Sequence, residues 1–351
     1  MKQHRSTLCE ILDLELPIIQ SPMAGAQGSA LAIAVSKAGA LGSLPCAMLS
    51  ADGMRKEIAM IRSQTGGPLN VNFFCHAEPT PDPAREAAWR TRLAPYYREF
   101  GIDPDSVEAD SGRGAFDAEM ADAVEEFQPE VVSFHFGLPS PSLVTRVLGW
   151  GSKILASATT VEEALWLEAH GVDIIVAQGL EAGGHRGIFL SDDLTTQVGT
   201  FALLPQIVNA VRIPVVAAGG LASAAGIAAA MSMGAAGVQL GTVYLLCPET
   251  TIRAPHRATL KSSMARHTAL TNIFSGRPAR GIVNRLIREL GPIASDAPAF
   301  PLASAAIAPL RKHGESQGSG DFSPLWSGQN ASGCKEIPAE DLTRELAADL
   351  V

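Results

Sequence analysis

The sequence has little cysteine, few aromatic residues and modest charge. Among 351 residues there are five cysteines, 5% aromatic side chains and 18% charged side chains. The cysteines are odd in number and scattered, without a C-x-x-C pair. This pattern argues against a disulfide framework or a zinc site, and it favours a protein that is kept in a reducing compartment.

Long apolar runs are also missing. The first ten residues lack the apolar core of a signal peptide, and no run approaches the roughly 18 apolar residues that a membrane helix requires. The formal net charge of -9 disfavours nucleic acid and anionic membranes as the main partners. We therefore expect a cytoplasmic protein that binds neither nucleic acid nor membrane.

Three catalytic signatures are absent as well. No predicted strand is followed by the G-x-G-x-x-G of a dinucleotide-binding fold, and no G-x-S-x-G marks a nucleophilic serine. No two His, Asp or Glu residues have the spacing of metal ligands on one helix face, and the pair His135 and His185 lacks a nearby carboxylate partner. We therefore expect no metal centre.

What the chain does contain is a regular alternation of short apolar runs and helical stretches. Some of these helical stretches begin with a strong cap, such as Thr160 with Glu163 three residues later. The predicted strands cover 17–23, 41–45, 69–74, 131–136, 153–158, 174–178, 215–218 and 237–241. The predicted helices cover 30–37, 51–62, 140–148, 160–170, 201–211 and 223–233. Eight strands alternating with helices predict an α/β fold of the TIM (β/α)8 barrel type. A doubly wound sheet is the alternative, but it usually stops at five to seven strands.

Two regions interrupt this alternation and suggest an inserted helical cap or substrate domain. The first is an insertion at about 75–128, within which 84–100 reads as a charged, exposed helix. The second follows the last strand and has little strand pattern, which suits a cap over the barrel mouth or an ordinary helical appendage equally well. The predicted domains are a barrel at 1–248, a cap at 249–312 and a tail at 313–351 that packs back on the barrel, partly through a short amphipathic helix at 338–350.

The carboxyl ends of the predicted strands carry amide, hydroxyl, glycine and imidazole groups, and almost no carboxylates. In a parallel barrel these ends meet at the face where ligands bind. Gly219 and Gly220 after one strand and Gly241 and Thr242 after the next offer backbone amides to a phosphate, although a tight turn is the alternative for each pair. The side-chain amides at positions 72 and 178 suit a heterocycle with alternating donors and acceptors. Flavin mononucleotide (FMN) fits this set of groups best.

The segment 173–187 places a histidine directly after the sixth predicted strand. Gly183 and Gly184 allow a tight turn that approaches a ligand closely, and His185 follows them. An imidazole at this position can exchange protons near neutral pH, since its ordinary pKa is about 6.5. The alternative is a surface histidine on a glycine loop. Its position opposite the two glycine pairs favours a role in the chemistry.

Several of these segments together resemble the nitronate monooxygenases, formerly called 2-nitropropane dioxygenases. The resemblance rests on the segments 17–25, 69–74, 176–187, 214–220 and 238–242, and it continues more weakly to 322–329. It implies an FMN-bearing barrel with a cap, a nitronate or nitroalkane and O2 as substrates, and His185 as the catalytic base. The residues implied or expected to contact FMN are Pro22, Met23, Asn72, Gln178, Gly183, Gly219, Gly220, Gln239, Leu240, Gly241 and Thr242.

The predicted substrate pocket departs from the family pattern. The family places tyrosines and a lysine near the segment 300–308, where this chain has Phe300, Ser304 and Ala308. We expect Phe300 and His135 to contact the substrate, with a buried, backbone-bonded imidazole as the alternative for His135. Arg186 is a further candidate for a polar contact, as is the arginine at position 277. The oligomeric state does not follow from these residues.

Two other functions are compatible with the same motifs. One is a flavin barrel that takes hydride from NAD(P)H and reduces a quinone or an enoyl substrate. The other is a protein that binds FMN or a phosphorylated metabolite without turning it over. Anaerobic bleaching by a nicotinamide would indicate the first, and an unchanged flavin spectrum with every substrate would indicate the second.

Overall fold

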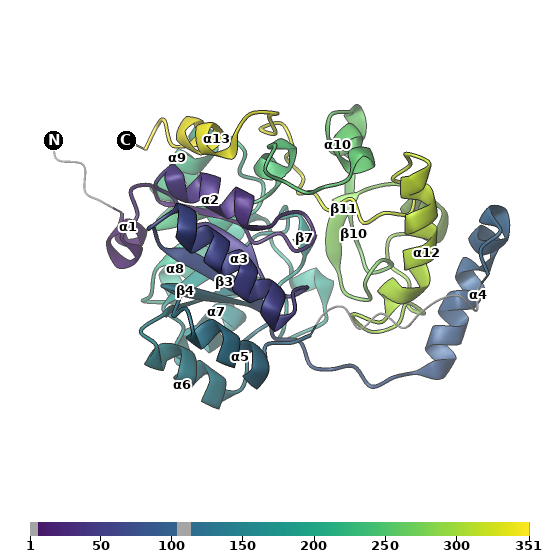
Figure 1. Ribbon diagram of the computed structural model, residues 1–351, viewed down its shortest axis with the longest axis horizontal. Helices are drawn as coiled ribbons and strands as arrows, with labels where there is room; N and C mark the ends of the chain where they lie inside the picture. Colours follow the sequence, from purple (N-terminus) through teal and green to yellow (C-terminus); the bar gives the residue numbers. More distant parts are fainter. Residues whose placement is uncertain (1–5, 104–113, 351) are drawn as a thin grey trace.

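The structure is a computed structural model that describes residues 6–103 and 114–350. Residues 1–5 of the predicted barrel, 104–113 of the predicted insertion and 351 of the predicted tail lie outside the described residues. The larger part of the chain forms a barrel, and a smaller cap stands beside its mouth (Figure 1). Within the described ranges, no helix combines the length and apolarity that a bilayer crossing needs.

A parallel sheet of eight strands forms the barrel, in the spatial order β1-β9-β8-β6-β5-β4-β3-β2. The ring closes where Ile19 of β1 forms a parallel bridge with Leu41 just before β2. The predicted TIM barrel is therefore confirmed, and four strands have the predicted limits. The strands are β1 Ile18–Gln20, β2 Gly42–Pro45, β3 Leu69–Phe74, β4 Val131–His135, β5 Lys153–Ala158, β6 Ile174–Gln178, β8 Val215–Ala218 and β9 Gly237–Leu240.

Helices cover the outside of this barrel because each βα unit buries the apolar face of its helix against the sheet. Thr160 accepts a hydrogen bond from the backbone N–H of Glu163, so the predicted cap of α7 is present. Near the end of the chain α13 packs against α2 and α9. These helices are α1 Thr7–Leu12, α2 Ser29–Lys37, α3 Ala51–Gln64, α5 Ala118–Glu125, α6 Pro141–Gly149, α7 Val161–Ala169, α8 Thr200–Ala210, α9 Ala224–Ser232 and α13 Ala339–Leu346.

The cap contains strands that the sequence pattern did not reveal. A three-stranded antiparallel sheet has the order β10-β11-β7, so the segment that was predicted to be a helical cap carries a sheet as well. Its strands are β7 Gly184–His185, β10 Thr268–Thr271 and β11 Ala279–Ile282. The helices around it are α10 Ala254–Leu260, α11 Arg285–Leu290 and α12 Ala303–Ser316, and short 3-10 turns lie at η2 Leu194–Thr196, η3 Thr242–Leu246 and η4 Ser263–Arg266.

The helix in the 75–128 insertion belongs to the cap by its contacts. This helix, α4 (Pro83–Phe100), runs away from the barrel and packs against α12 (Figure 1). The prediction that it is an exposed helix is wrong on one face, because Trp89 and Leu93 are fully buried there. A 2.6 Å ion pair joins Arg92 to Asp296. Charged residues on the outer face of α4 masked this apolar face in the sequence.

Candidate functional site

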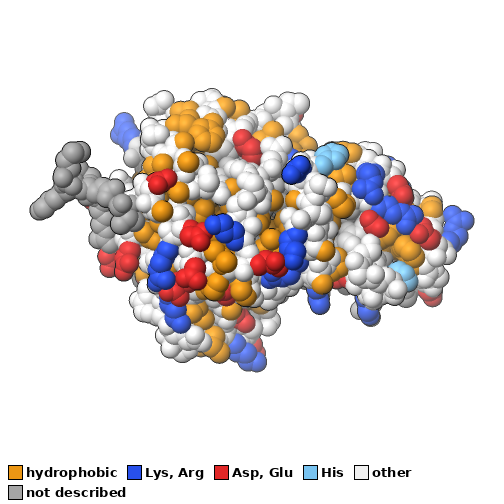
Figure 2. Space-filling view, turned by 90° about the horizontal axis from the view of Figure 1, so that it is seen from above, with side chains coloured by type: hydrophobic (Ala, Val, Ile, Leu, Met, Phe, Trp, Pro, Cys, Tyr) orange, Lys and Arg blue, Asp and Glu red, His pale blue; other side chains and the backbone are white. Residues whose placement is uncertain are grey.

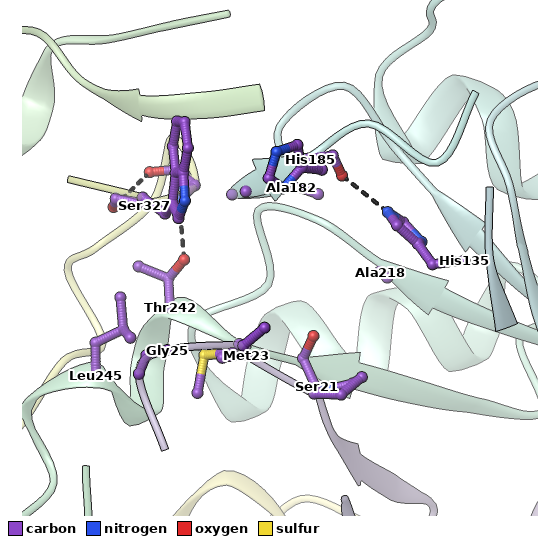
Figure 3. Close-up of a pocket in the computed structure, with 18 of the residues that line it drawn as sticks. Ser21, Met23, Gly25, His135, Ala182, His185, Ala218, Thr242, Leu245 and Ser327 are labelled. Carbon is purple, nitrogen blue, oxygen red and sulfur yellow. Dashed lines mark hydrogen bonds between the residues drawn. The ribbon is translucent and has the colours of Figure 1, made fainter. Parts of the chain in front are cut away.

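One cavity of about 650 Å³ lies at the carboxyl ends of the barrel strands, under the cap. A volume of this size suits a cofactor together with a small substrate. Figure 3 shows His185, Thr242, Met23 and Ser21 around the opening. The cavity is lined by every predicted site residue except Phe300, namely Pro22, Met23, Asn72, His135, Gln178, Gly183, His185, Gly219, Gly220, Gln239, Leu240, Gly241 and Thr242.

The two glycine loops have backbone conformations that suit an anion site. Gly219 and Gly220 have φ values of 119° and 72°, which side chains with a Cβ rarely adopt. At Gly219 a Cβ would also lie 2.8 Å from the Thr200 hydroxyl. Helix α9 begins directly afterwards, and its N-cap Ser223 accepts a hydrogen bond from the backbone of Gly226. The loop therefore places backbone amides at the cavity wall, a few residues before the start of α9.

A strap formed by residues 327–330 completes this wall, and the sequence prediction missed it. The backbone N–H of Gly328 donates to Thr242 Oγ1 at 2.9 Å, and Asn330 Nδ2 donates to the Gly220 carbonyl at 3.0 Å. The strap also runs so close to Gly183 that a Cβ there would lie 2.5 Å from the Gly328 nitrogen. Its glycine- and serine-rich composition predicts only a tail. The weak resemblance of 322–329 to the nitronate monooxygenases is the sequence signal that points to a role.

His185 lies on strand β7 rather than on the predicted turn. Its backbone pairs with Ala279 of β11, so the barrel loop and the cap sheet hold it between them. The imidazole Nε2 is 2.8 Å from Ser275 Oγ, and that hydroxyl donates to the Arg277 carbonyl at 3.3 Å. A hydroxyl has a single hydrogen to donate, so it accepts from His185 and the imidazole proton is assigned to Nε2. Nδ1 then carries the lone pair that a base requires.

Aromatic rings surround this imidazole. The ring centres of Phe300 and Trp326 lie 5.3 and 5.4 Å from that of His185, and that of Phe74 lies 6.2 Å away. Phe300 is buried behind the cavity and thus contacts the histidine rather than the open space. Apart from its contact with Ser275, the imidazole is therefore enclosed by apolar rings from both the barrel and the cap.

Two predicted site residues brace the backbone of His185. Gln178 Nε2 donates to the His185 carbonyl at 3.0 Å, and Gln178 Oε1 accepts from the N–H of Gly187 at 2.7 Å. His135 Nε2 donates to the same carbonyl at 3.1 Å, and its Nδ1 lies 3.0 Å from the Ser157 hydroxyl. Burial lowers the pKa of His135 to about 4, so its ring is neutral at pH 7. This geometry favours the buried, backbone-bonded alternative for His135.

The two arginines considered for the substrate pocket are held elsewhere. Arg186 is completely buried and donates to the carbonyls of Gln178 and Gly179 at 2.7 and 2.6 Å. Burial lowers its pKa to about 10, which still leaves it charged at neutral pH. Arg277 stacks on Phe136, with its guanidinium carbon 4.1 Å from the ring centre. Both arginines therefore hold loops together, and neither lines the cavity.

Comparisons with known proteins cover nearly the whole chain. The family model of nitronate monooxygenases matches residues 5–349. Nitronate monooxygenases of Paraburkholderia phytofirmans and Pseudomonas aeruginosa are both 41% identical, over 99% and 97% of this chain and 95% and 97% of their own lengths. A crystal structure of nitroalkane oxidase from Streptomyces ansochromogenes is 39% identical, covers 98% of both chains and superposes with a TM-score of 0.88. The chain therefore belongs to the nitronate monooxygenase family, and the protein is an oxidoreductase.

Proposed function

We propose that the protein uses FMN to oxidise alkyl nitronates with O2, and nitroalkanes after loss of their α-proton, giving a carbonyl compound and nitrite. The atoms balance when two nitronate anions and one O2 give two carbonyl molecules and two nitrite ions. The names of the relatives support the reaction class. The observation that carries the proposal is a histidine, with its lone pair assigned to Nδ1, beside a cavity that two glycine loops line.

The cavity fits FMN in its chemistry. Positive φ values at Gly219 and Gly220, together with the strap over Thr242, form a cradle that a Cβ would fill. Such backbone amides are typical phosphate ligands. Met23 and Asn72 also line the cavity, and the planar ring of FMN would lie against them. FMN bound there would supply the redox chemistry, since it can accept electrons from a nitronate and pass them to oxygen.

The residues around His185 would manage the proton. Ser275 fixes the Nε2 proton, so Nδ1 is the atom that removes the α-proton of a nitroalkane. Once that proton has arrived, the imidazolium would hold the nitronate anion by charge. Gln178 and His135 both donate to the His185 carbonyl and keep the backbone in position. The rings of Phe74, Phe300 and Trp326 would keep water away from the imidazole.

The test is a steady-state assay of purified, FMN-loaded protein with the nitronate of nitroethane. We expect nitrite release together with oxygen uptake. The proposal fails if neither occurs while NADH or NADPH bleaches the flavin anaerobically, because that result identifies a nicotinamide-dependent reductase. A flavin spectrum that changes with neither type of substrate would also overturn it and would indicate a binding protein.

A further inference from the structure

The exposed part of the cavity wall marks where ligands enter. Four of the residues that line the cavity are exposed, whereas the others are buried or half-buried. Gly25 and Met48 lie on barrel loops, and Thr251 and Arg253 lie at the start of the cap. The two sides meet, since the backbone N–H of Thr251 donates to the Ala26 carbonyl at 2.8 Å. We call the four exposed residues the mouth of the cavity.

A groove of about 850 Å³ runs along helix α12 and meets the cavity at this mouth. Met48 and Arg253 of the mouth line the groove as well as the cavity. The groove is therefore the outer approach to the cavity and not a separate site. The residues that line both hollows are Met48, Arg253, Pro255, Arg311, Glu315, Pro324 and Trp326.

The charged side chains along this approach are mostly basic. Among the described residues that line the cavity or the groove, the Lys and Arg residues are Arg253, Arg311 and Lys312, and the one carboxylate is that of Glu315. One oxygen of Glu315 accepts from Arg311 Nε at 2.8 Å, and the other lies 3.9 Å from Arg253 Nε. Three cations against one carboxylate leave an excess of two positive charges. Figure 2 shows Lys and Arg side chains on both sides of the boundary between the barrel and the cap.

This local charge is opposite in sign to that of the whole chain, whose formal net charge is -9. The net charge repels an anion, and the phosphate of bound FMN would add to this repulsion. A basic patch at the entrance of a cleft attracts anions locally and raises their rate of association. A nitronate carries one negative charge, whereas its parent nitroalkane carries none. The two forms of the substrate therefore respond differently to the arginines at the mouth.

We propose that Arg253 and Arg311 select the nitronate anion over the neutral nitroalkane while the substrate enters the cavity. The attraction depends on the charge of the whole substrate, so it does not require proton transfer to His185. This inference rests on the proposed oxidation of nitronates. It makes the two arginines specificity-determining residues that act before the chemical step.

Salt dependence tests the inference on the FMN-loaded enzyme. Nitrite release gives kcat/KM for ethyl nitronate and for nitroethane between about 20 mM and about 500 mM NaCl, where the screening length falls from about 20 Å to about 4 Å. We expect kcat/KM for ethyl nitronate to fall about tenfold, because salt screens the attraction. The value for neutral nitroethane should change by less than about twofold. Equal salt dependence for the two substrates would contradict the inference.

Substitutions at the mouth assign the effect to the two arginines. Arg253→Gln and Arg311→Gln should each lower kcat/KM for ethyl nitronate about threefold at low salt, the effect of a unit charge several ångström away in water. At high salt, and with nitroethane, both variants should match the unaltered enzyme. Arg253→Lys should retain the full value because it keeps the charge. Arg212→Gln is the matched control, since Arg212 is exposed and precedes β8 at the end of the barrel opposite the cavity.

Two results with these variants would overturn the inference. One is a kcat/KM for ethyl nitronate that is the same in both mouth variants as in Arg212→Gln. The other is weaker binding of FMN but not of riboflavin, because it would show that the arginines hold the phosphate of the cofactor. Fluorescence titration of the apoproteins measures both affinities, and circular dichroism verifies that each variant is folded. Absence of nitrite from both substrates with the unaltered enzyme would instead overturn the proposed function.

Discussion

The barrel and the cap build their cores from different residues and by different routes. The barrel core is mainly aliphatic and comes from strands and helices that follow one another in the sequence. The cap core is rich in large rings and gathers segments from far apart in the chain. Its aromatic members are Trp89, Tyr96, Tyr97, Phe274 and Phe322. The barrel core therefore forms from segments that are close in the sequence. The cap core depends on contacts between segments about two hundred residues apart, as between Arg92 and Asp296.

The candidate active site combines both types of region. The barrel supplies the glycine loops and the cradle for a cofactor, and the cap supplies Ser275, Phe300 and the groove along α12. His185 lies on the strand that joins the two sheets. If this division is correct, changes in the cap should alter proton transfer and substrate choice, and changes in the barrel loops should alter cofactor affinity.

The largest expected effect comes from the residue at the junction itself. Replacing His185 by Asn should lower kcat/KM for neutral nitroalkanes by about 10² to 10⁴, the range for loss of a general base. Preformed nitronates should lose much less, because they no longer need deprotonation. Nitrite release from nitroethane and from its nitronate measures both values. A variant that oxidises neutral nitroethane at the full rate would remove His185 from the role of base.

Truncating the cap core should loosen the cap without removing the cofactor site. Trp89→Ala should cost about 3–5 kcal/mol, the usual range for a large buried ring. Hydrogen exchange should accelerate in α4 and α12 and remain slow in the barrel strands. Trp89→Phe is the control, since the buried Trp89 Nε1 forms no hydrogen bond in the described structure and the phenyl ring preserves most of the packing. Equal acceleration in the barrel would show that the two cores unfold as one unit.

Lowering the pH should destabilise both regions through buried histidines. Burial lowers the pKa of His135 in the barrel and that of His256 in the cap to about 4. Both imidazole rings are neutral in the folded protein. Their contribution to the free energy of unfolding is therefore complete above pH 6.5 and is lost as the pH falls toward 4. From pH 7 to pH 5 we expect a loss of about 2 kcal/mol per histidine. Urea unfolding of His135→Gln should show a shallower pH dependence, and an unchanged dependence would contradict this assignment.

The smallest expected effect is steric and is confined to the barrel loops. Gly183→Ala would place a Cβ 2.5 Å from the Gly328 nitrogen, so the strap must shift. Overpacking of this type costs about 1–3 kcal/mol. If the cost falls on the bound state, FMN binding weakens by roughly fivefold to 150-fold. Fluorescence titration of the apoprotein with FMN measures this change. Gly66→Ala is the control because a Cβ at Gly66 meets nothing within 4 Å. Equal FMN affinity in the two variants would separate the strap from the cofactor site.

Sequence patterns predicted the barrel well because its signals are short in range. An apolar run such as 215–218, which follows Pro214, specifies a buried strand, and the glycines at 219 and 220 mark a turn at its end. The same patterns misread α4, since a charged outer face outweighed the few rings on its inner face. They also missed β10 and β11, where mixed residues become strands through pairing with each other and with β7.

The sequence by itself determined the barrel, the glycine loops at its mouth and the position of His185 after the sixth strand. Only the tertiary structure decided which nitrogen of His185 carries the proton, because Ser275 is 90 residues away in the chain. It likewise placed the strap at 327–330 against Gly183 and Thr242, and it aligned α12 with the cavity. Local periodicity records which residues are buried, but it does not record which distant segment covers them.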